Sequence, residues 1–184
     1  MPRPNPPESV LLVDGYNVIG AWYCLQKTRD IHGLEASRNE LIEVLVNYTA
    51  YKGFDTQIVF DAQYRNTNSN TEIITKSLSV CYTNFGQTAD TYIEKFCASF
   101  RRHLHPLSRK RVIVATSDRA QKLTVVGYGA EWMSAEQLEY EVESVNSSIG
   151  RKQKNKKQTS ARFLVSSLDA KSQQKLAELR KSLK

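Results

Sequence analysis

Apolar runs that end at acidic or turn-forming residues recur along this 184-residue chain, with segments of helical spacing between them. The runs are SVLLVD (9–14), TQIVFDA (56–62), LSVCYT (78–83), RVIVATSD (111–118) and the short AEWMS (130–134). Strands that alternate with crossover helices build a mainly parallel sheet with both faces covered. We therefore predict an α/β fold around a mainly parallel central sheet.

The segments between these runs carry helix start and stop signals. Residues 33–53 place Leu and Tyr side chains on one stripe, and Gly53 is expected to end that helix. A second helix is expected after Thr88, whose hydroxyl suits an N-cap. The Asn-rich stretch QYRNTNSNTE, residues 63–72, is expected to be a loop that follows a strand.

The positive charge of the chain is concentrated in its C-terminal part. The net charge is +7 overall, but residues 150–184 contribute +9 and residues 1–149 contribute −2. The run RKQKNKK, residues 151–157, holds five cations, a pattern that suits contacts with a phosphate backbone and equally a solvated linker. We expect one domain over residues 1–149, then a basic linker and a closing helix, SLDAKSQQKLAELRKSL, within residues 150–184.

Other features limit the class of protein. The apolar runs fall short of the roughly 20 residues of a membrane helix, and the N-terminus lacks a signal-peptide pattern, so we expect a soluble, cytoplasmic protein with no membrane partner. Three widely spaced cysteines, Cys24, Cys81 and Cys97, form neither a disulfide framework nor a zinc pair. We expect them to be buried free thiols.

Acidic residues stand at four successive strand ends. Asp14, Asp61 and Asp118 end apolar runs, and Asp90 opens the helix that follows residues 78–83. The carboxyl ends of parallel strands share one edge of a sheet, so these four side chains are expected to gather there. Crowded carboxylates repel one another unless a cation lies among them, and the hard ions Mg²⁺ and Mn²⁺ bind such oxygens. Taken singly, each acid could instead shape a turn or cap a helix.

Other chemistries that use acids or phosphate loops fit less well. A phosphate-transferring aspartate of the haloacid-dehalogenase type would need a second Asp at position 16, which is Tyr16. Neither GxxxxGK[ST] nor GxGxxG follows the first run, which argues against a nucleotide cradle. His32, His103 and His105 have no partner at metal-ligand spacing, and we expect them to be non-catalytic.

Four motifs taken in order resemble the YacP-like group of NYN-domain proteins, relatives of the PIN-domain ribonucleases. They are LLVDGYNVIGAW, IVFDA, FGQTADTYIEKF and VIVATSDRAQ, and the resemblance covers about residues 9–149. It implies a PIN-like three-layer α/β/α fold and a metal-dependent endoribonuclease. Bacterial members of the group are linked to decay of messenger RNA on the ribosome, so RNA and the ribosome are the expected partners.

The resemblance also implies roles for individual residues. The catalytic positions that it matches are Asp14, Asn17, Asp90 and Asp118, and the Mg²⁺ or Mn²⁺ ligands are Asp14, Asp90, Asp118 and Asp61. Such a metal would activate a water, while Asn17 would orient a metal-bound water or a phosphate oxygen without adding charge. The expected RNA contacts are Arg38, Arg119, Arg151, Lys152, Lys154, Lys156 and Lys157.

Two rival functions remain open at this point. A PIN-like domain could bind RNA or the ribosome without cutting it, in which case the acids would tolerate replacement. A small-molecule phosphohydrolase could use the same α/β scaffold, but the basic tail would not help it, and salt-sensitive RNA binding would distinguish the two.

Overall fold

The structure is a computed structural model that describes residues 9–61, 70–103 and 110–166. For residues 70, 102, 103 and 152–166 only the backbone is described. In chain order the elements are β1 (Ser9–Asp14), α1 (Gly15–Ala21), α2 (Tyr23–His32), α3 (Leu34–Lys52), β2 (Asp55–Phe60), β3 (Asn70–Ile73), β4 (Leu78–Tyr82), α4 (Ala89–His103), β5 (Arg111–Ala115), α5 (Arg119–Gly127), β6 (Glu131–Met133) and α6 (Ala135–Ser166).

In the described part of the chain, a six-stranded sheet in the order β3-β4-β2-β1-β5-β6 forms the centre of the fold. Every pair is parallel except β3 with β4, so the predicted mainly parallel sheet is confirmed. Strand β1 is central, and Val10 aligns with Asp55 of β2 and with Val112 of β5. The strand order reverses between β1 and β5, which is where open α/β sheets place their ligand sites.

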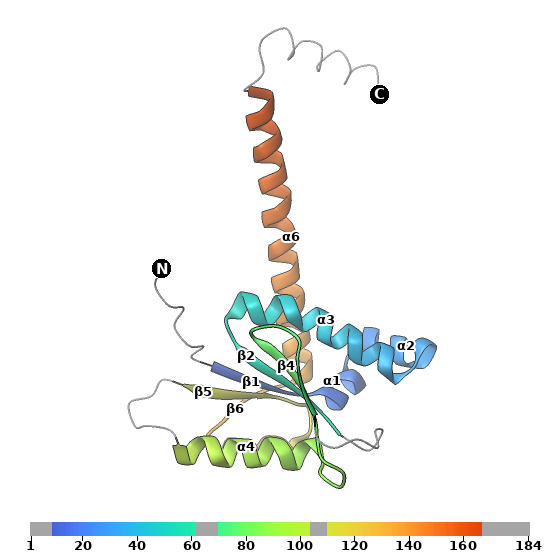
Figure 1. Cartoon of the computed structure of the whole chain (residues 1–184), viewed down its shortest axis with the longest axis vertical. Coiled ribbons are helices and arrows are strands. Elements are labelled where there is room, and N and C mark those ends of the chain that lie inside the picture. The colour runs from blue at the N-terminus through green and yellow to red at the C-terminus, as the bar shows by residue number, and fades with distance from the viewer. Residues whose placement is uncertain (1–8, 62–69, 104–109, 167–184) are drawn as a thin grey trace. The chain divides into compact units, whose positions relative to one another are not determined.

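Helices cover both faces of this sheet, as Figure 1 shows for α3 on one side and α4 on the other. Alternate strand residues point to opposite faces. On the α4 and α5 side, Leu12 and Val114 pack with Ile93 of α4 and Val125 of α5. On the other side α1 and α3 contact β2, with Leu41 among the fully buried residues of α3. The predicted three-layer α/β/α fold is confirmed.

The stop signal of α3 and the start signal of α4, the two long helices on opposite faces of the sheet, are confirmed. Helix α3 ends at Gly53, whose φ of 68° is left-handed and therefore suits glycine. The Thr88 hydroxyl accepts a hydrogen bond from the Thr91 N–H at 3.1 Å, as expected of an N-cap. The short helices α1 and α2 were not foreseen, because the residues after Asp14 show no long apolar period.

One local prediction was wrong. Residues 70–72 of the expected loop belong to β3, an antiparallel edge strand paired with β4, and residues 62–69 lie outside the described residues. Residues 151–157 lie inside α6, so the basic run is helical, and its role as a linker stays a prediction. Backbone contacts divide the chain into Met1–Val145 and Asn146–Lys184. The expected closing helix lies outside the described residues, and the assignment of a nuclease domain to residues 1–149 stays a prediction.

Two further predictions from the sequence concern membrane-spanning helices and the burial of the cysteines. No helix in the described ranges combines the length and the apolar character that a bilayer crossing requires. Cys81 and Cys97 are buried, as predicted, but Cys24 on α2 is exposed, so that part of the prediction was wrong. Helix α2 buries Leu25 toward the core, and the neighbouring residue therefore faces outward.

We expect Gly15→Ala to destabilise the protein, because a Cβ at position 15 would overlap the Phe60 ring. That ring cannot yield easily, since it is fully buried and lies 5.0 Å from the Tyr16 ring and 5.7 Å from the Tyr82 ring between centroids. Overpacking of this kind costs about 1–3 kcal/mol, measurable by urea unfolding. Gly20→Ala is the control, since a Cβ there meets nothing within 4 Å. Equal stability of the two variants would contradict the close approach.

Candidate active site

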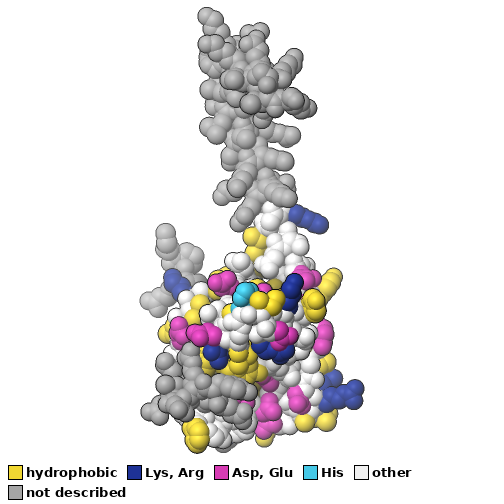
Figure 2. All heavy atoms as spheres, turned by 90° about the vertical axis from the view of Figure 1, so that its right-hand side faces the viewer, with side chains coloured by type: hydrophobic (Ala, Val, Ile, Leu, Met, Phe, Trp, Pro, Cys, Tyr) yellow, Lys and Arg dark blue, Asp and Glu magenta, His cyan; other side chains and the backbone are white. Residues whose placement is uncertain are grey.

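The four strand-end acids lie at the same edge of the sheet. Asp14 is the last residue of β1, Asp61 follows β2, and Asp118 follows β5. Asp90 lies in the first turn of α4, the helix after β4. Asp14 interacts electrostatically with all three of the others. Figure 2 looks onto the side toward which the strands point, and acidic side chains lie there among basic ones. The predicted gathering of acids is therefore present.

Three of these acids also accept hydrogen bonds at helix N-termini; capping was the alternative expected for Asp118, and a turn was the alternative expected for Asp14. Asp14 Oδ1 accepts from the Asn17 N–H at 3.2 Å, at the start of α1. Asp118 Oδ1 accepts from the N–H groups of Ala120 at 2.7 Å and Gln121 at 3.0 Å. Asp61 Oδ1 accepts from the N–H of Ala89, the first residue of α4. Each cap uses one oxygen and holds the carboxylate in place, so capping and ligand binding are compatible.

The electrostatics of the site penalise negative charge at Asp14. Asp14 is 7% exposed. Its pKa is raised to about 7: burial is the largest cause, repulsion from Asp90, Asp61 and Asp118 adds to it, and the hydrogen bond from the Asn17 N–H opposes it. Burial also raises the pKa of Asp90, and repulsion from Asp118 and Asp61 raises it further. A hydrogen bond with Asp14 opposes the shift. A positive charge among these groups would reverse the penalty.

Gln121 is a site residue that was not singled out from the sequence. It is 2% exposed, and its Nε2 donates to Asp90 Oδ1 at 2.7 Å. Its Oε1 is buried and has no hydrogen-bond partner in the described part of the chain. Its place three residues after Asp118, on the first turn of α5, was the available signal. Gln121 therefore orients Asp90 and leaves an unmet acceptor beside the acids.

Asn17 joins two loops at the point where the strand order reverses. Its Oδ1 accepts from the Ser117 N–H at 2.7 Å, which links the start of α1 to the loop before α5. The Ser117 hydroxyl in turn lies 3.1 Å from Glu136 Oε2 and accepts from the Ala135 N–H at 3.1 Å. The side-chain oxygen of Asn17 is thus committed to the backbone, and only its NH₂ group is left to donate toward a substrate.

The residues expected to contact RNA have different surroundings. Arg38 is 7% exposed, donates to the Tyr16 hydroxyl at 3.0 Å and lies 6.0 Å from the centroid of the Tyr82 ring. Arg119 is exposed directly after Asp118, and Arg151 is exposed on α6. The other expected contacts, Lys152, Lys154, Lys156 and Lys157, have side chains outside the described set. Arg38 therefore supports Tyr16, whereas Arg119 is open to a ligand beside the acids.

The chemistry of the acids fits a hard cation, although the site is not closed around one. Among the described residues, no three Asp, Glu, His or Cys side chains converge closely enough to coordinate one ion as they stand. The donor set nevertheless consists of carboxylate oxygens, which Mg²⁺ and Mn²⁺ prefer. The raised pKa of Asp14 and the unpaired Oε1 of Gln121 are both conditions that a cation and its waters would relieve.

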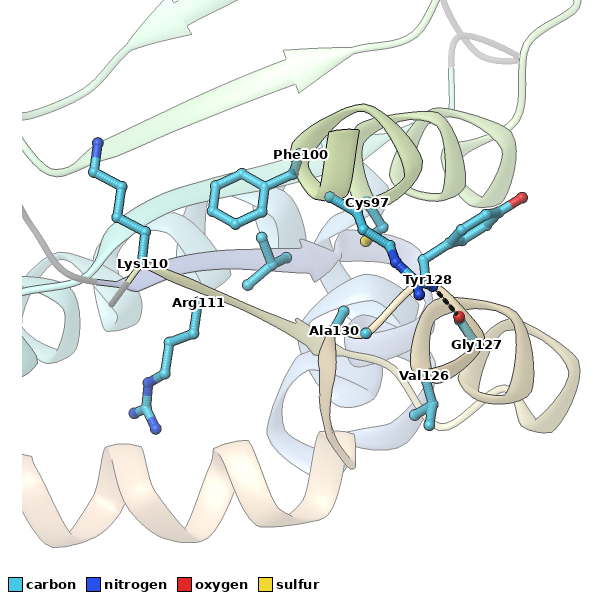
Figure 3. A pocket seen from close by; sticks show the side chains of 11 residues that line it. Cys97, Phe100, Lys110, Arg111, Val126, Gly127, Tyr128 and Ala130 are labelled. Carbon is cyan, nitrogen blue, oxygen red and sulfur yellow. Dashed lines mark hydrogen bonds between the residues drawn. The ribbon is translucent and has the colours of Figure 1, made fainter. Parts of the chain in front are cut away.

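A cavity of about 390 Å³ lies at the opposite end of β5, away from the acids. Cys97, Phe100 and Ala130 line it, and Figure 3 shows Lys110 and Arg111 at its side pointing in opposite directions. Arg111 Nε donates to the Ser9 hydroxyl at 3.0 Å. Because none of the described residues that line this cavity carries a carboxylate, the edge that carries the acids is the better candidate for metal-dependent phosphate chemistry.

We expect the metal-free protein to lose stability through Asp14 as the pH rises. The pKa is about 7 in the fold and 3.8 ordinarily, so the folded state favours the protonated form. The stability that protonated Asp14 contributes to the folded state is fully present below about pH 4 and is lost as the pH rises through 7. Asp14→Asn cannot ionise, and in EDTA at pH 8 it should exceed the wild type in stability by up to about 4 kcal/mol, converging with it near pH 4.

Urea unfolding at several pH values measures this difference. Asp55→Asn is the control, because Asp55 is exposed at the other edge of the sheet, at the start of β2. An Asp14→Asn variant that is no more stable than the wild type at pH 8 would contradict the strained charge at Asp14.

Comparisons with known proteins show the family to which the chain belongs. The chain matches the YacP-like NYN domain family over residues 11–181. It is 34% identical over 149 residues to the protein YacP of Bacillus subtilis (strain 168), covering 78% of this chain and 80% of YacP. The crystal structure of Rae1 (YacP) from Bacillus subtilis covers 94% of both chains with a TM-score of 0.63 and 28% identity. A mutant form covers 93% of this chain and 99% of its own, with a TM-score of 0.66 and 28% identity. The chain therefore belongs to the YacP-like NYN domain family, and NYN domains are nuclease-like.

Proposed function

We propose that the protein is a metal-dependent endoribonuclease that cleaves phosphodiester bonds of RNA. The observation that carries this proposal is the group of four carboxylates from separate strand ends, centred on the buried Asp14. Membership of a nuclease-like family supports the reaction class. We further propose messenger RNA on the ribosome, in the cytoplasm, as the substrate, which extends the resemblance of the sequence motifs.

The proposed cofactor is Mg²⁺ or Mn²⁺, held by Asp14, Asp90 and Asp118 with Asp61 as a further ligand. Burial, with repulsion from the neighbouring carboxylates added to it, raises the pKa of both Asp14 and Asp90, which supports a cation at this place. When bound, the cation would supply the charge that offsets the attacked phosphate and the acidity that makes water a nucleophile at neutral pH.

The residues of the chain itself would keep this site in one arrangement. The N–H groups at the start of α5 hold Asp118, and Gln121 holds Asp90. The bond from Asn17 to Ser117 keeps the ends of β1 and β5 together. Groups that are positioned before the substrate arrives need no reorganisation during the reaction. Arg119, exposed beside Asp118, would hold a phosphate of the RNA chain.

We expect Asp14→Asn, Asp90→Asn and Asp118→Asn each to lower RNA cleavage by orders of magnitude while RNA binding persists. Each change removes a negative charge that the cation needs but keeps the shape and a hydrogen-bond acceptor for the caps. The measurement uses a 5′-labelled unstructured RNA with Mn²⁺, and maps product ends, which should be a 5′ phosphate and a 3′ hydroxyl. Asp55→Asn, at the opposite edge of the sheet, should cut normally.

Two controls separate the candidate functions. EDTA should abolish cleavage without changing the circular dichroism, and Mn²⁺ or Mg²⁺ should restore it. Full cleavage in EDTA, or by Asp14→Asn, would overturn the metal-dependent assignment. Tight RNA or ribosome binding by the wild type without any cleavage would favour the inactive binding protein. Comparing naked message with the same message on translating ribosomes tests the proposed ribosomal substrate.

We expect the basic run of α6 to contribute affinity for RNA. Replacing the five cations of residues 151–157 by Gln should weaken RNA or ribosome binding and reduce its salt dependence. The slope of log K against log salt should fall by up to about 0.7 for each lost phosphate contact on a single strand. A variant that exchanges Lys for Arg and Arg for Lys over the same residues keeps the charge and is the control. An unchanged slope in the Gln variant would mean that residues 151–157 form a solvated helix surface and do not contact RNA phosphates.

A further inference from the structure

A second cavity, of about 350 Å³, lies directly beside Asp118. Arg119 and Lys122 of α5 line it, together with Trp132 of β6. The Trp132 ring is fixed, because its Nε1 donates to the Thr116 carbonyl at 2.8 Å. Lys122 Nζ lies 3.6 Å from the centroid of that ring. The cavity therefore has a cation held against a fixed aromatic wall.

Lys122 lies one helical turn from Asp118. Its backbone N–H donates to the Asp118 carbonyl at 3.0 Å, so the two residues are related as i and i+4. Asp118 is the N-cap of α5 and Lys122 lies in its first turns, and both residues line the cavity. A group bound at the Lys122 ammonium would therefore be a close neighbour of a group bound at the Asp118 carboxylate.

The charge of Lys122 is held in place without being neutralised. Within the described ranges, none of the ion pairs involves Lys122. A ring face attracts an ammonium but leaves its positive charge available. The two carboxylates at the cavity have other donors: Asp118 accepts from backbone N–H groups, and Glu136 Oε2 lies 3.1 Å from the Ser117 hydroxyl. The Lys122 ammonium is therefore held in one position, and its positive charge is available to bind an anion.

We propose that Lys122, positioned by Trp132, binds the RNA phosphate next to the one that is cleaved. The inference rests on the proposed function, because it takes the cleaved phosphate to lie at the acids. A single strand carries one phosphate per nucleotide, so a strand with one phosphate at Asp118 brings a neighbouring phosphate past the next turn of α5. Holding the lysine beforehand lowers the ordering cost of binding. Trp132 acts here as a positioning residue, not a catalytic one.

Binding to an unstructured RNA oligonucleotide over a range of KCl concentrations tests the role of Lys122. The full chain carries Asp14→Asn, so that the RNA stays intact during the measurement. Adding Lys122→Gln should weaken binding and reduce the salt slope by about 0.7, the value for one phosphate contact on a single strand. Lys76→Gln is the matched control, because Lys76 is exposed in the turn before β4, at the other edge of the sheet. It removes the same charge and should leave the affinity nearly unchanged.

Two substitutions of Trp132 test its positioning role. Both Trp132→Phe and Trp132→Leu remove the indole N–H that bonds to Thr116, but only leucine removes the ring face. Trp132→Leu should therefore weaken RNA binding more than Trp132→Phe does, with thermal melts used to compare the folds. Tryptophan emission should change when RNA is added and should lose that change in Trp132→Phe. The buried Trp22, at 2% exposure, remains as a constant background.

The outcomes separate this inference from the proposed function. In the enzyme with Asp14 intact, Lys122→Gln should raise KM several-fold and leave kcat nearly unchanged. If the protein cuts RNA but Lys122→Gln equals Lys76→Gln in affinity and salt slope, the phosphate subsite is wrong and the nuclease assignment stands. If RNA binds through Lys122 but is never cut, the nuclease assignment fails, and the placement of Lys122 next to a cleaved phosphate fails with it, leaving only an RNA contact at Lys122. If the protein does not bind RNA at all, both are overturned.

Discussion

The burial of Asp14 at the end of the central strand is the constraint on which the candidate site depends. A carboxylate at this position is 7% exposed and faces three other acids, so burial and repulsion together raise its pKa to about 7. The same side chain caps α1, and the hydrogen bond that it accepts from the Asn17 N–H offsets part of that cost. Gly15 is required next to it, since any larger residue would overlap Phe60. Asp14 and Gly15 thus serve three purposes. They form the turn into α1, they let the backbone approach the Phe60 ring closely, and they place a carboxylate in the candidate site.

The hydrogen bonds around Asp14 show how structural and chemical roles can share the same side chains. Helix N-termini supply N–H groups that orient a carboxylate and favour its charge. Asn17 then joins β1 to the loop after β5, across the reversal of strand order. The proposed RNA substrate is a polyanion, and an acidic site that binds it would use a cation within the site and basic groups beside it. Arg119 and Lys122 are in that place on α5.

Much of the fold could be predicted because its signals are local. The apolar runs around β1 and β5 and the period of α3 identified the strands and helices, and their alternation predicted the parallel sheet. Strand β3 could not be predicted, because its four residues depend on pairing with β4 for their hydrogen bonds. The helical state of residues 151–157 was missed for a related reason, since a dense run of cations disfavours a helix locally.

The sequence by itself determined which acids share an edge, because the carboxyl end of each strand can be identified from where its apolar run stops. Only the tertiary structure decided how those acids are held. Gln121 reaches Asp90 across 31 positions of the chain, and Lys122 meets the ring of Trp132 from a different element. Arg38, expected to contact RNA, is buried and donates to the Tyr16 hydroxyl. Such contacts depend on how helices pack over the sheet and on which way each side chain turns, and neither is encoded in local periodicity.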